Sequence, residues 1–297
     1  MKTIKPLMLI ILLLLFSAGY GQEAKHTVDY QSIYNLHPVN LSTGQWRVNF
    51  QAGFTHFYKV FNPKMGKIDK INPKIVLNDA YFTAYGMYGL NNKWNLTFTL
   101  PFINKHHYTP MLFQQGVGFG DIQLGAVYQV QNLTALSHRA ISLELAAGLP
   151  TGHGNDLKPT DIPTGLGTFA FTGKVNALFK GKKFDIWSNL YYQYRLPQEH
   201  KSVGDEAGLY VLLQKPYKTT VGTFGWETGL NAYYTFPTEM MEHQIPITEQ
   251  KIANYMIGGW YAYLDKYYIR FGVPYTFYQN GTFLTKYQVL LQLDYQF

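Results

Sequence analysis

The last eleven residues of the chain, YQVLLQLDYQF (287–297), alternate between apolar and polar side chains. One face collects Tyr287, Val289, Leu291, Leu293, Tyr295 and Phe297. The opposite face is polar except for Leu290. Because successive side chains of a β-strand point to opposite faces, this alternation predicts a strand with one apolar and one polar face.

The first residues carry the features of an export signal. Lys2 and Lys5 precede an apolar run over 7–16, and Gly19 and Gly21 follow with the spacing of a cleavage site. The run is too short for a spanning helix, which needs about 20 residues. We therefore expect a cleaved signal peptide over 1–21, a periplasmic lead-in or plug over 22–42, and one folded unit over 43–297. The chain has no Cys, which excludes disulfides and a lipid anchor on Cys.

The composition differs from that of an ordinary soluble domain. Aromatic residues make up 17% of the chain and charged residues only 14%, against about 25% charged in soluble domains. After the signal region, no apolar stretch is long enough to cross a membrane as a helix. An exported chain that is rich in aromatics and poor in charge is typical of a transmembrane β-barrel, which spreads its apolar residues over every second position.

Period-two alternation recurs along the whole chain. It predicts strands over 44–58, 80–90, 93–102, 121–130, 139–149, 169–179, 184–195, 207–214, 226–236, 251–263, 267–278 and 287–297. The facing of 80–90, 207–214 and 251–263 stays open because both of their faces are largely apolar, and ten or fourteen strands are alternatives. The expected fold is an all-β, antiparallel, up-and-down transmembrane barrel, with twelve strands because single-chain bacterial barrels have even numbers.

The connections between these strands differ in length. With the C-terminus in the periplasm, the periplasmic turns are 91–93, 131–139, 180–183, 215–225 and 264–266. The outer loops are then 59–78, 103–118, 150–168, 196–206, 237–250 and 279–282. Short periplasmic turns and long outer loops are usual in outer-membrane barrels. Two connections depart from this rule, because 215–225 is long and 279–282 is short.

Three segments resemble a known family of outer-membrane barrels. They are GFGDIQLGAVYQVQ (118–131), ISLELAAGLPTGHGND (141–156) and TGLGTFAFTGKVNALF (164–179), and HPVNLSTGQWRVNFQAGF (37–54) also resembles the family's entry into its first strand. The family is described as transporters, or as the MetA-pathway of phenol degradation. The resemblance implies an outer-membrane channel for small hydrophobic or aromatic compounds. Resemblance to outer-membrane proteins also implies that Tyr295 and Phe297 form the signal that the barrel assembly machinery reads.

Charged residues on the strands are expected to point into the barrel, since facing lipid costs Arg or Lys about 2–4 kcal/mol at the membrane midplane. The cations are Arg47, Lys174, Arg195, Arg270 and Lys286, and the acids are Asp121, Glu144, Asp185, Glu227 and Asp294. Two interpretations remain open: ion pairs that fill the barrel, or a filter for solutes. Equal numbers of each sign argue against strong selection by charge. We interpret Pro150 and the glycines of loop 150–168 mainly as structural residues. Pro150 ends a strand, and the glycines let the chain turn sharply.

These observations predict a channel in the bacterial outer membrane for passive passage of small solutes, with no cofactor and no bound metal. Expected partners are membrane lipid, lipopolysaccharide and a solute. The lysines of 59–78 are the candidates for contact with lipopolysaccharide, and the alternative interpretation is that 59–78 is simply a solvated loop. No nucleic-acid motif is present. One alternative is a surface or secretion barrel. Another is a lipid hydrolase, although the H-x-S-N-G motif is absent and the Ser and His of LSHRAIS (136–142) fall on a periplasmic turn.

Overall fold

A computed structural model describes residues 39–62, 67–70, 76–108, 113–134, 137–153, 161–197, 201–240, 243–245, 249–264, 266–280 and 283–297. The signal peptide and most of the expected lead-in, 22–38, lie outside these residues. No helix in the described part of the chain is long and apolar enough to span a membrane.

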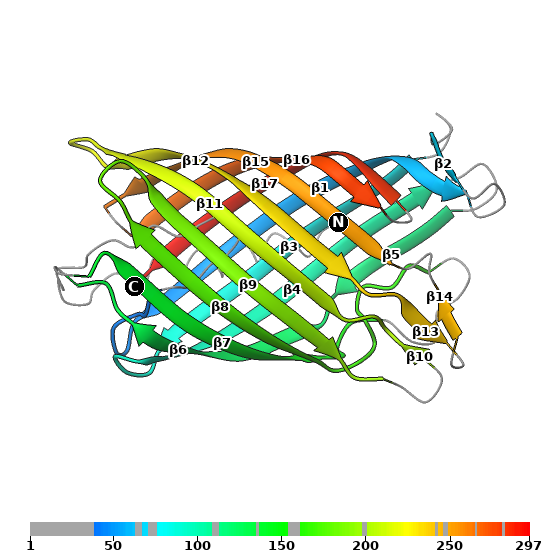
Figure 1. Cartoon of the computed structure of the whole chain (residues 1–297), viewed down its shortest axis with the longest axis horizontal. Helices are drawn as coiled ribbons and strands as arrows, with labels where there is room; N and C mark the ends of the chain where they lie inside the picture. Colours follow the sequence, from blue (N-terminus) through cyan, green and yellow to red (C-terminus); the bar gives the residue numbers. More distant parts are fainter. Residues whose placement is uncertain are drawn as a thin grey trace, which may run out of the picture.

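The described chain is built from antiparallel strands, as Figure 1 shows. Their bounds are β1 (Trp46–Asn62), β2 (Lys67–Lys70), β3 (Val76–Gly89), β4 (Trp94–Tyr108), β5 (Phe113–Phe119), β6 (Ile122–Gln131), β7 (Arg139–Leu149), β8 (Ala170–Lys180), β9 (Asp185–Arg195), β10 (Lys201–Ser202), β11 (Glu206–Lys218), β12 (Thr223–Thr235), β13 (Thr238–Met240), β14 (His243–Ile245), β15 (Gln250–Tyr263), β16 (Tyr267–Asn280) and β17 (Phe283–Gln296).

The long strands form a closed barrel in which each strand pairs with the next, and β17 pairs back with β1. β5 and β6 both pair with β4, so they are two sections of one strand interrupted at 120–121. Counted in this way, twelve strands surround the barrel, which confirms the predicted fold. β2 is a short hairpin partner of β1, and β10, β13 and β14 form a separate small sheet.

Closure depends on the terminal stretch 287–297. Asn49 of β1 lies opposite Asp294, and Phe54 lies opposite Val289. The final residue completes the pairing, because the Phe297 amide donates to the Trp46 carbonyl at 2.9 Å and the Trp46 amide donates to the Phe297 carbonyl at 2.8 Å. The seam therefore pairs its backbone groups continuously from Arg47 to His56, as a barrel in lipid requires.

The two ends of the barrel differ. At the turn end, defined by connections 90–93, 132–138, 181–184, 219–222 and 264–266, the strands are joined by short segments. The opposite end, here called the loop end, carries the small sheet of β10, β13 and β14 (Figure 1).

Several expected connections are shorter than predicted. The connection expected over 215–225 is a four-residue turn, in which the Thr219 amide donates to the Gly222 carbonyl. The loops expected over 59–78 and 103–118 are also partly strand, because β1 reaches Asn62 and β4 reaches Tyr108. These residues are too polar for apolar alternation, yet their backbones continue to pair with the neighbouring strand.

The outer surface is apolar, as the alternation predicts. The exposed outward residues include Phe82, Leu96, Leu124, Leu145, Phe171, Leu190, Leu230, Ile257, Ile269 and Leu293. Aromatic pairs lie at the turn end: Trp46 with Tyr88, Trp94 with Tyr128 and Tyr267 with Tyr295 have ring centroids 4.6, 4.9 and 4.7 Å apart. An apolar belt bordered by aromatic rings indicates a barrel that spans a bilayer.

The structure also decides the facing of the three ambiguous strands. In β3, β11 and β15 the inward side chains include Tyr85, Met87, Leu212, Met256 and Trp260, all nearly inaccessible to solvent. The sequence could not assign this facing, because large apolar side chains lie on both faces of these strands. Their inward members belong to an apolar filling of the barrel.

Candidate functional site: the barrel interior

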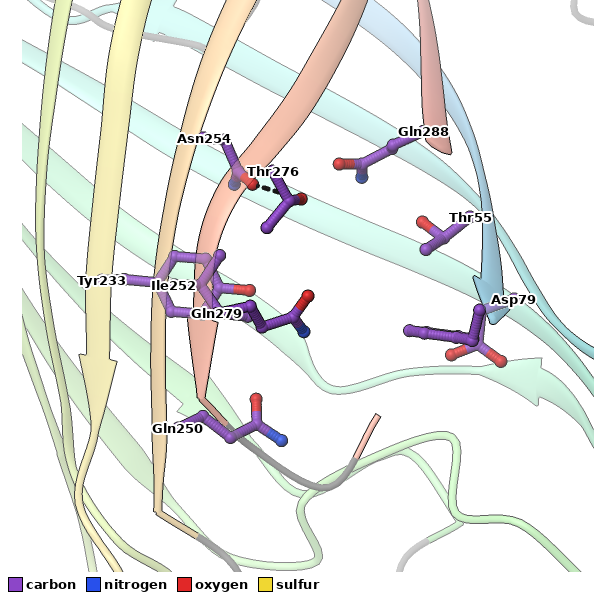
Figure 2. Close-up of a pocket in the computed structure, with 10 residues that line it drawn as sticks. Thr55, Asp79, Tyr233, Gln250, Ile252, Asn254, Thr276, Gln279 and Gln288 are labelled. Carbon is purple, nitrogen blue, oxygen red and sulfur yellow. Dashed lines mark hydrogen bonds between the residues drawn. The ribbon is translucent and has the colours of Figure 1, made fainter. Parts of the chain in front are cut away.

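A cavity of about 270 Å³ opens in the loop-end half of the barrel. Six strands line it (β1, β3, β12, β15, β16 and β17), and the side chains in Figure 2 point toward a common space. The lining residues are Thr55, Phe57, Asp79, Tyr233, Gln250, Ile252, Asn254, Thr276, Gln279 and Gln288. We call this space the outer cavity.

The polar groups of the outer cavity are held in place by neighbours. The Thr276 hydroxyl donates to Asn254 Oδ1 at 2.7 Å (Figure 2). Asp79 Oδ1 lies 3.1 Å from His107 Nε2, within hydrogen-bond range. Beside Gln250, the pKa of Glu249 is lowered because Lys251 and the Tyr234 hydroxyl donate to its carboxylate.

A charged layer, formed by Glu227, Arg270 and Asp294, lies closer to the turn end. Arg270 Nη1 is 3.4 Å from Glu227 Oε2, and Arg270 Nε is 3.8 Å from Asp294 Oδ2. Gln214 donates to Glu227 at 2.7 Å and Gln292 donates to Asp294 at 2.8 Å. Arg270 and Glu227 have no exposed surface, so the ion pairs and the amide hydrogen bonds must offset the cost of burying these charges. They do so in part, since Arg270 Nε and Nη2 have no hydrogen-bond partner among the described residues.

The strand between Glu227 and Arg270 contributes a glycine to this layer. Gly258 of β15 lies opposite Glu227 in the strand register. A Cβ atom at Gly258 would lie 2.6 Å from the Phe271 carbonyl oxygen and 3.3 Å from Glu227 Cγ. Glycine therefore lets Glu227 lean across β15 toward Arg270. The guanidinium also lies over the rings of Trp260 and Tyr268, 5.7 and 5.8 Å from their centroids.

A second group of polar residues lies on β7, β8 and β9. Lys174 pairs with Glu144 at 2.8 Å, and Lys174 keeps a quarter of its side chain exposed. Asn189 donates to Asn176 Oδ1 at 2.7 Å, and Asn176 donates to the Ser142 hydroxyl at 3.3 Å. These contacts join neighbouring strands through their inward faces.

The turn-end half of the interior contains an apolar cluster, which lies among buried polar residues such as Asn49, Asn95 and Gln214. Its buried members are Ala140, Leu178, Trp187, Leu212, Met256, Trp260, Ala262, Tyr268 and Leu290. Val39 packs against this cluster, and Leu41 packs with Tyr85 and Met87. The Leu41 amide donates to Asn95 Oδ1 at 3.3 Å. The last residues of the expected lead-in are therefore seated inside the turn end, while 22–38 lie outside the described residues.

The remaining predicted lumen residues occupy other positions. Arg47 donates to Gln296 at 2.9 Å in the closure seam, and Asp185 is buried at the turn-end start of β9. Arg195 donates to Gln193, to the Gly204 carbonyl and to Glu206 near the loop end. Lys286 belongs to β17, but its side chain lies outside the described part of the structure.

Asp121 anchors loop 150–168. Its carboxylate accepts the Gly152 amide at 3.0 Å and the Leu166 amide at 2.6 Å. A Cβ atom at Gly165 would collide with Asp121 Oδ1. The carboxylate is thus committed to backbone amides that join the two arms of the loop, in line with the structural interpretation of its glycines.

The sequence interpretation concentrated on charges and therefore missed the uncharged residues of the outer cavity. Part of the signal was present, because Gln250, Asn254, Thr276 and Gln288 fall at inward positions of the last three strands. Gln279 does not, because it has the opposite parity to Thr276, and a register shift in the pairing of β15 with β16 brings it to the cavity.

The described structure also bears on two other kinds of chemistry, metal binding and lipid hydrolysis. Among the described residues, no group of three His, Asp or Glu lies close enough together to hold a metal ion. The Ser137 hydroxyl donates to the Arg139 carbonyl and accepts from Gln131, and its backbone amide donates to Thr134 Oγ1. These contacts hold the turn together.

No protein-family model matches the sequence, and a comparison with curated proteins finds no relative. Among solved structures, an outer-membrane channel from Pseudomonas putida F1 is similar in fold, with a TM-score of 0.71, 12% identity, and coverage of 87% of this chain and 97% of that one. The NanC porin covers 84% of this chain and 98% of its own at 9% identity, with a TM-score of 0.45. The CymD monoaromatic hydrocarbon channel covers 86% and 88% at 9% identity, with a TM-score of 0.40. At these identities the similarity shows a shared barrel fold, and the family resemblance of 118–179 stays a prediction.

Proposed function

We propose that this protein is a channel of the bacterial outer membrane that lets small solutes pass passively. The observation that carries the proposal is the closed barrel with an apolar outside and a polar interior, hollowed by the outer cavity. A barrel whose only role was to anchor an outer loop would need no such hollow. The similarity in fold to the channel from Pseudomonas putida F1 supports the same proposal.

The charged layer and the apolar cluster form the narrow part of the path. Solutes enter at the loop end, and the Glu227–Arg270–Asp294 contacts lie between the outer cavity and the turn end. The layer holds two carboxylates against one guanidinium, so we expect at most a weak preference for cations. Val39 and Leu41 narrow the turn end further. Lys174, Glu144 and the other inward charges line or support this path.

The test is single-channel recording in planar bilayers with residues 22–297 refolded into lipid. We expect small, steady conductance steps with weak ion selectivity, and larger steps after deletion of 22–42, because Val39 and Leu41 are then removed from the interior. A matched control deletes 22–38 only and keeps both side chains. The absence of steps from all three refolded chains would contradict the channel proposal.

A further inference from the structure

The family resemblance of the sequence implies hydrophobic or aromatic solutes, but the lining of the outer cavity is mostly polar. Four carboxamides (Gln250, Asn254, Gln279 and Gln288) and three hydroxyls (Thr55, Thr276 and Tyr233) contribute to it. Of its ten lining residues Asp79 is the only charged one, and its carboxylate lies beside His107 at 3.1 Å. Polar but mostly uncharged groups therefore dominate the lining.

This set of groups matches one kind of solute. A carboxamide both donates and accepts hydrogen bonds, and so does each hydroxyl of a polyhydroxylated solute. An apolar solute would remove water from these amides without replacing its hydrogen bonds, which is unfavourable. A solute anion would meet no fixed cation among the lining residues and would be repelled by Asp79.

Size and aromatic groups narrow the class further. The cavity volume of about 270 Å³ lies just below the roughly 300–1,000 Å³ that is usual for pockets of drug-sized ligands. Phe57 and Tyr233 also line the space. The faces of their rings carry negative charge density, which attracts the polarised C–H groups of a sugar ring. Ring faces beside amides thus suit both the apolar and the polar surfaces of such a solute.

Resting on the proposed channel function, we propose that the outer cavity binds neutral polyhydroxylated solutes of monosaccharide size. The juxtaposition that carries the proposal is the convergence of carboxamides from β15, β16 and β17 with Tyr233 of β12 and Phe57 of β1 around one cavity. The cavity then selects the solute at the loop end, before the charged layer is reached.

The test measures binding rather than passage, so its outcome is independent of conductance. Saturation-transfer NMR on residues 22–297 folded in detergent uses D-glucose, myo-inositol, D-gluconate and phenol as separate probes. We expect transfer to glucose and inositol, and weaker transfer to gluconate and phenol. Equal or stronger transfer to phenol, or none to either neutral polyol, would overturn the proposal.

Variants locate the binding within the cavity. Gln279→Leu and Asn254→Leu each remove a carboxamide and should weaken polyol binding roughly three- to tenfold, which is the value of a net hydrogen bond. The matched control is Asn280→Leu, since Asn280 is the neighbour of Gln279 on β16 and is not among the lining residues. Gln250→Leu replaces either variant that does not fold, as judged by heat-dependent mobility on gels. Unchanged binding in the folded cavity variants would overturn the proposal even if the protein conducts.

Discussion

The two halves of the barrel interior follow different rules. The loop-end half has the polar interior that strand alternation predicts, and its side chains surround an open cavity. The turn-end half is more tightly filled, because an apolar cluster that includes Leu178 and Trp187 packs there among buried polar residues such as Asn49, Asn95 and Gln214. Alternation thus describes the outer surface along the whole barrel, whereas the interior combines a polar cavity at one end with a mixed apolar and polar filling at the other.

The charged layer lies in the turn-end half, beside the apolar cluster. Arg270 contacts Glu227 and Asp294 and lies over Trp260 of the apolar cluster. A cation that contacts carboxylates and also lies near aromatic rings suits both kinds of surroundings. The comparison suggests a division of roles: the loop-end half recognises the solute, and the turn-end half provides stability and closes the path.

The largest expected effect comes from truncation in the turn-end half. Trp187→Ala removes a side chain that is 1% exposed and should lower the free energy of unfolding by about 4 kcal/mol, because a large cavity remains in a packed interior. Urea titration in phospholipid vesicles measures the change. Tyr233→Ala, in the loop-end half, is the matched comparison and should cost less than half as much. Equal losses would contradict the proposed division.

The next largest effect on the free energy of unfolding is expected in the charged layer. Arg270→Met leaves Glu227 and Asp294 without their cation and should cost about 3 kcal/mol in the same titration, at the low end for buried pairs because both contacts are long. The double variant Arg270→Met with Glu227→Leu should recover part of this loss, since one buried charge is then removed. If the single variant is as stable as the parent protein, the charged layer is not a structural contact.

A smaller effect is expected outside both halves, at the loop anchor. Asp121→Asn keeps the shape of the side chain but weakens the hydrogen bonds from the Gly152 and Leu166 amides, at a cost of about 1–2 kcal/mol. Limited proteolysis should show faster cleavage in loop 150–168, while glucose binding in the outer cavity stays unchanged. Ser142→Ala, which changes an inward residue far from the loop, serves as the control for proteolysis. Loss of glucose binding in the Asp121 variant would place this loop at the solute site instead.

Much of the barrel could be predicted from local pattern. Period-two segments located nine of the twelve strands, and three weaker segments were added to complete the barrel. Arg47, Glu144, Glu227, Arg270 and Asp294 were expected on inward faces, and the structure finds them buried. The pattern is informative because lipid excludes charges from one face of every strand. It was least informative for β3, β11 and β15, where the interior itself is apolar and both faces look alike.

The sequence by itself determined the fold class and the seam between 287–297 and β1, because backbone pairing and contact with lipid act on each strand separately. It favoured twelve strands but left ten and fourteen open, and the structure decided the count. Only the tertiary structure decided which inward side chains meet. Glu227 reaches Arg270 across Gly258 of β15, Asp121 holds loop 150–168 rather than a solute, and amides from three strands converge on one cavity. These contacts depend on the strand register and on the curvature of the closed sheet, which bring together residues that no local pattern relates.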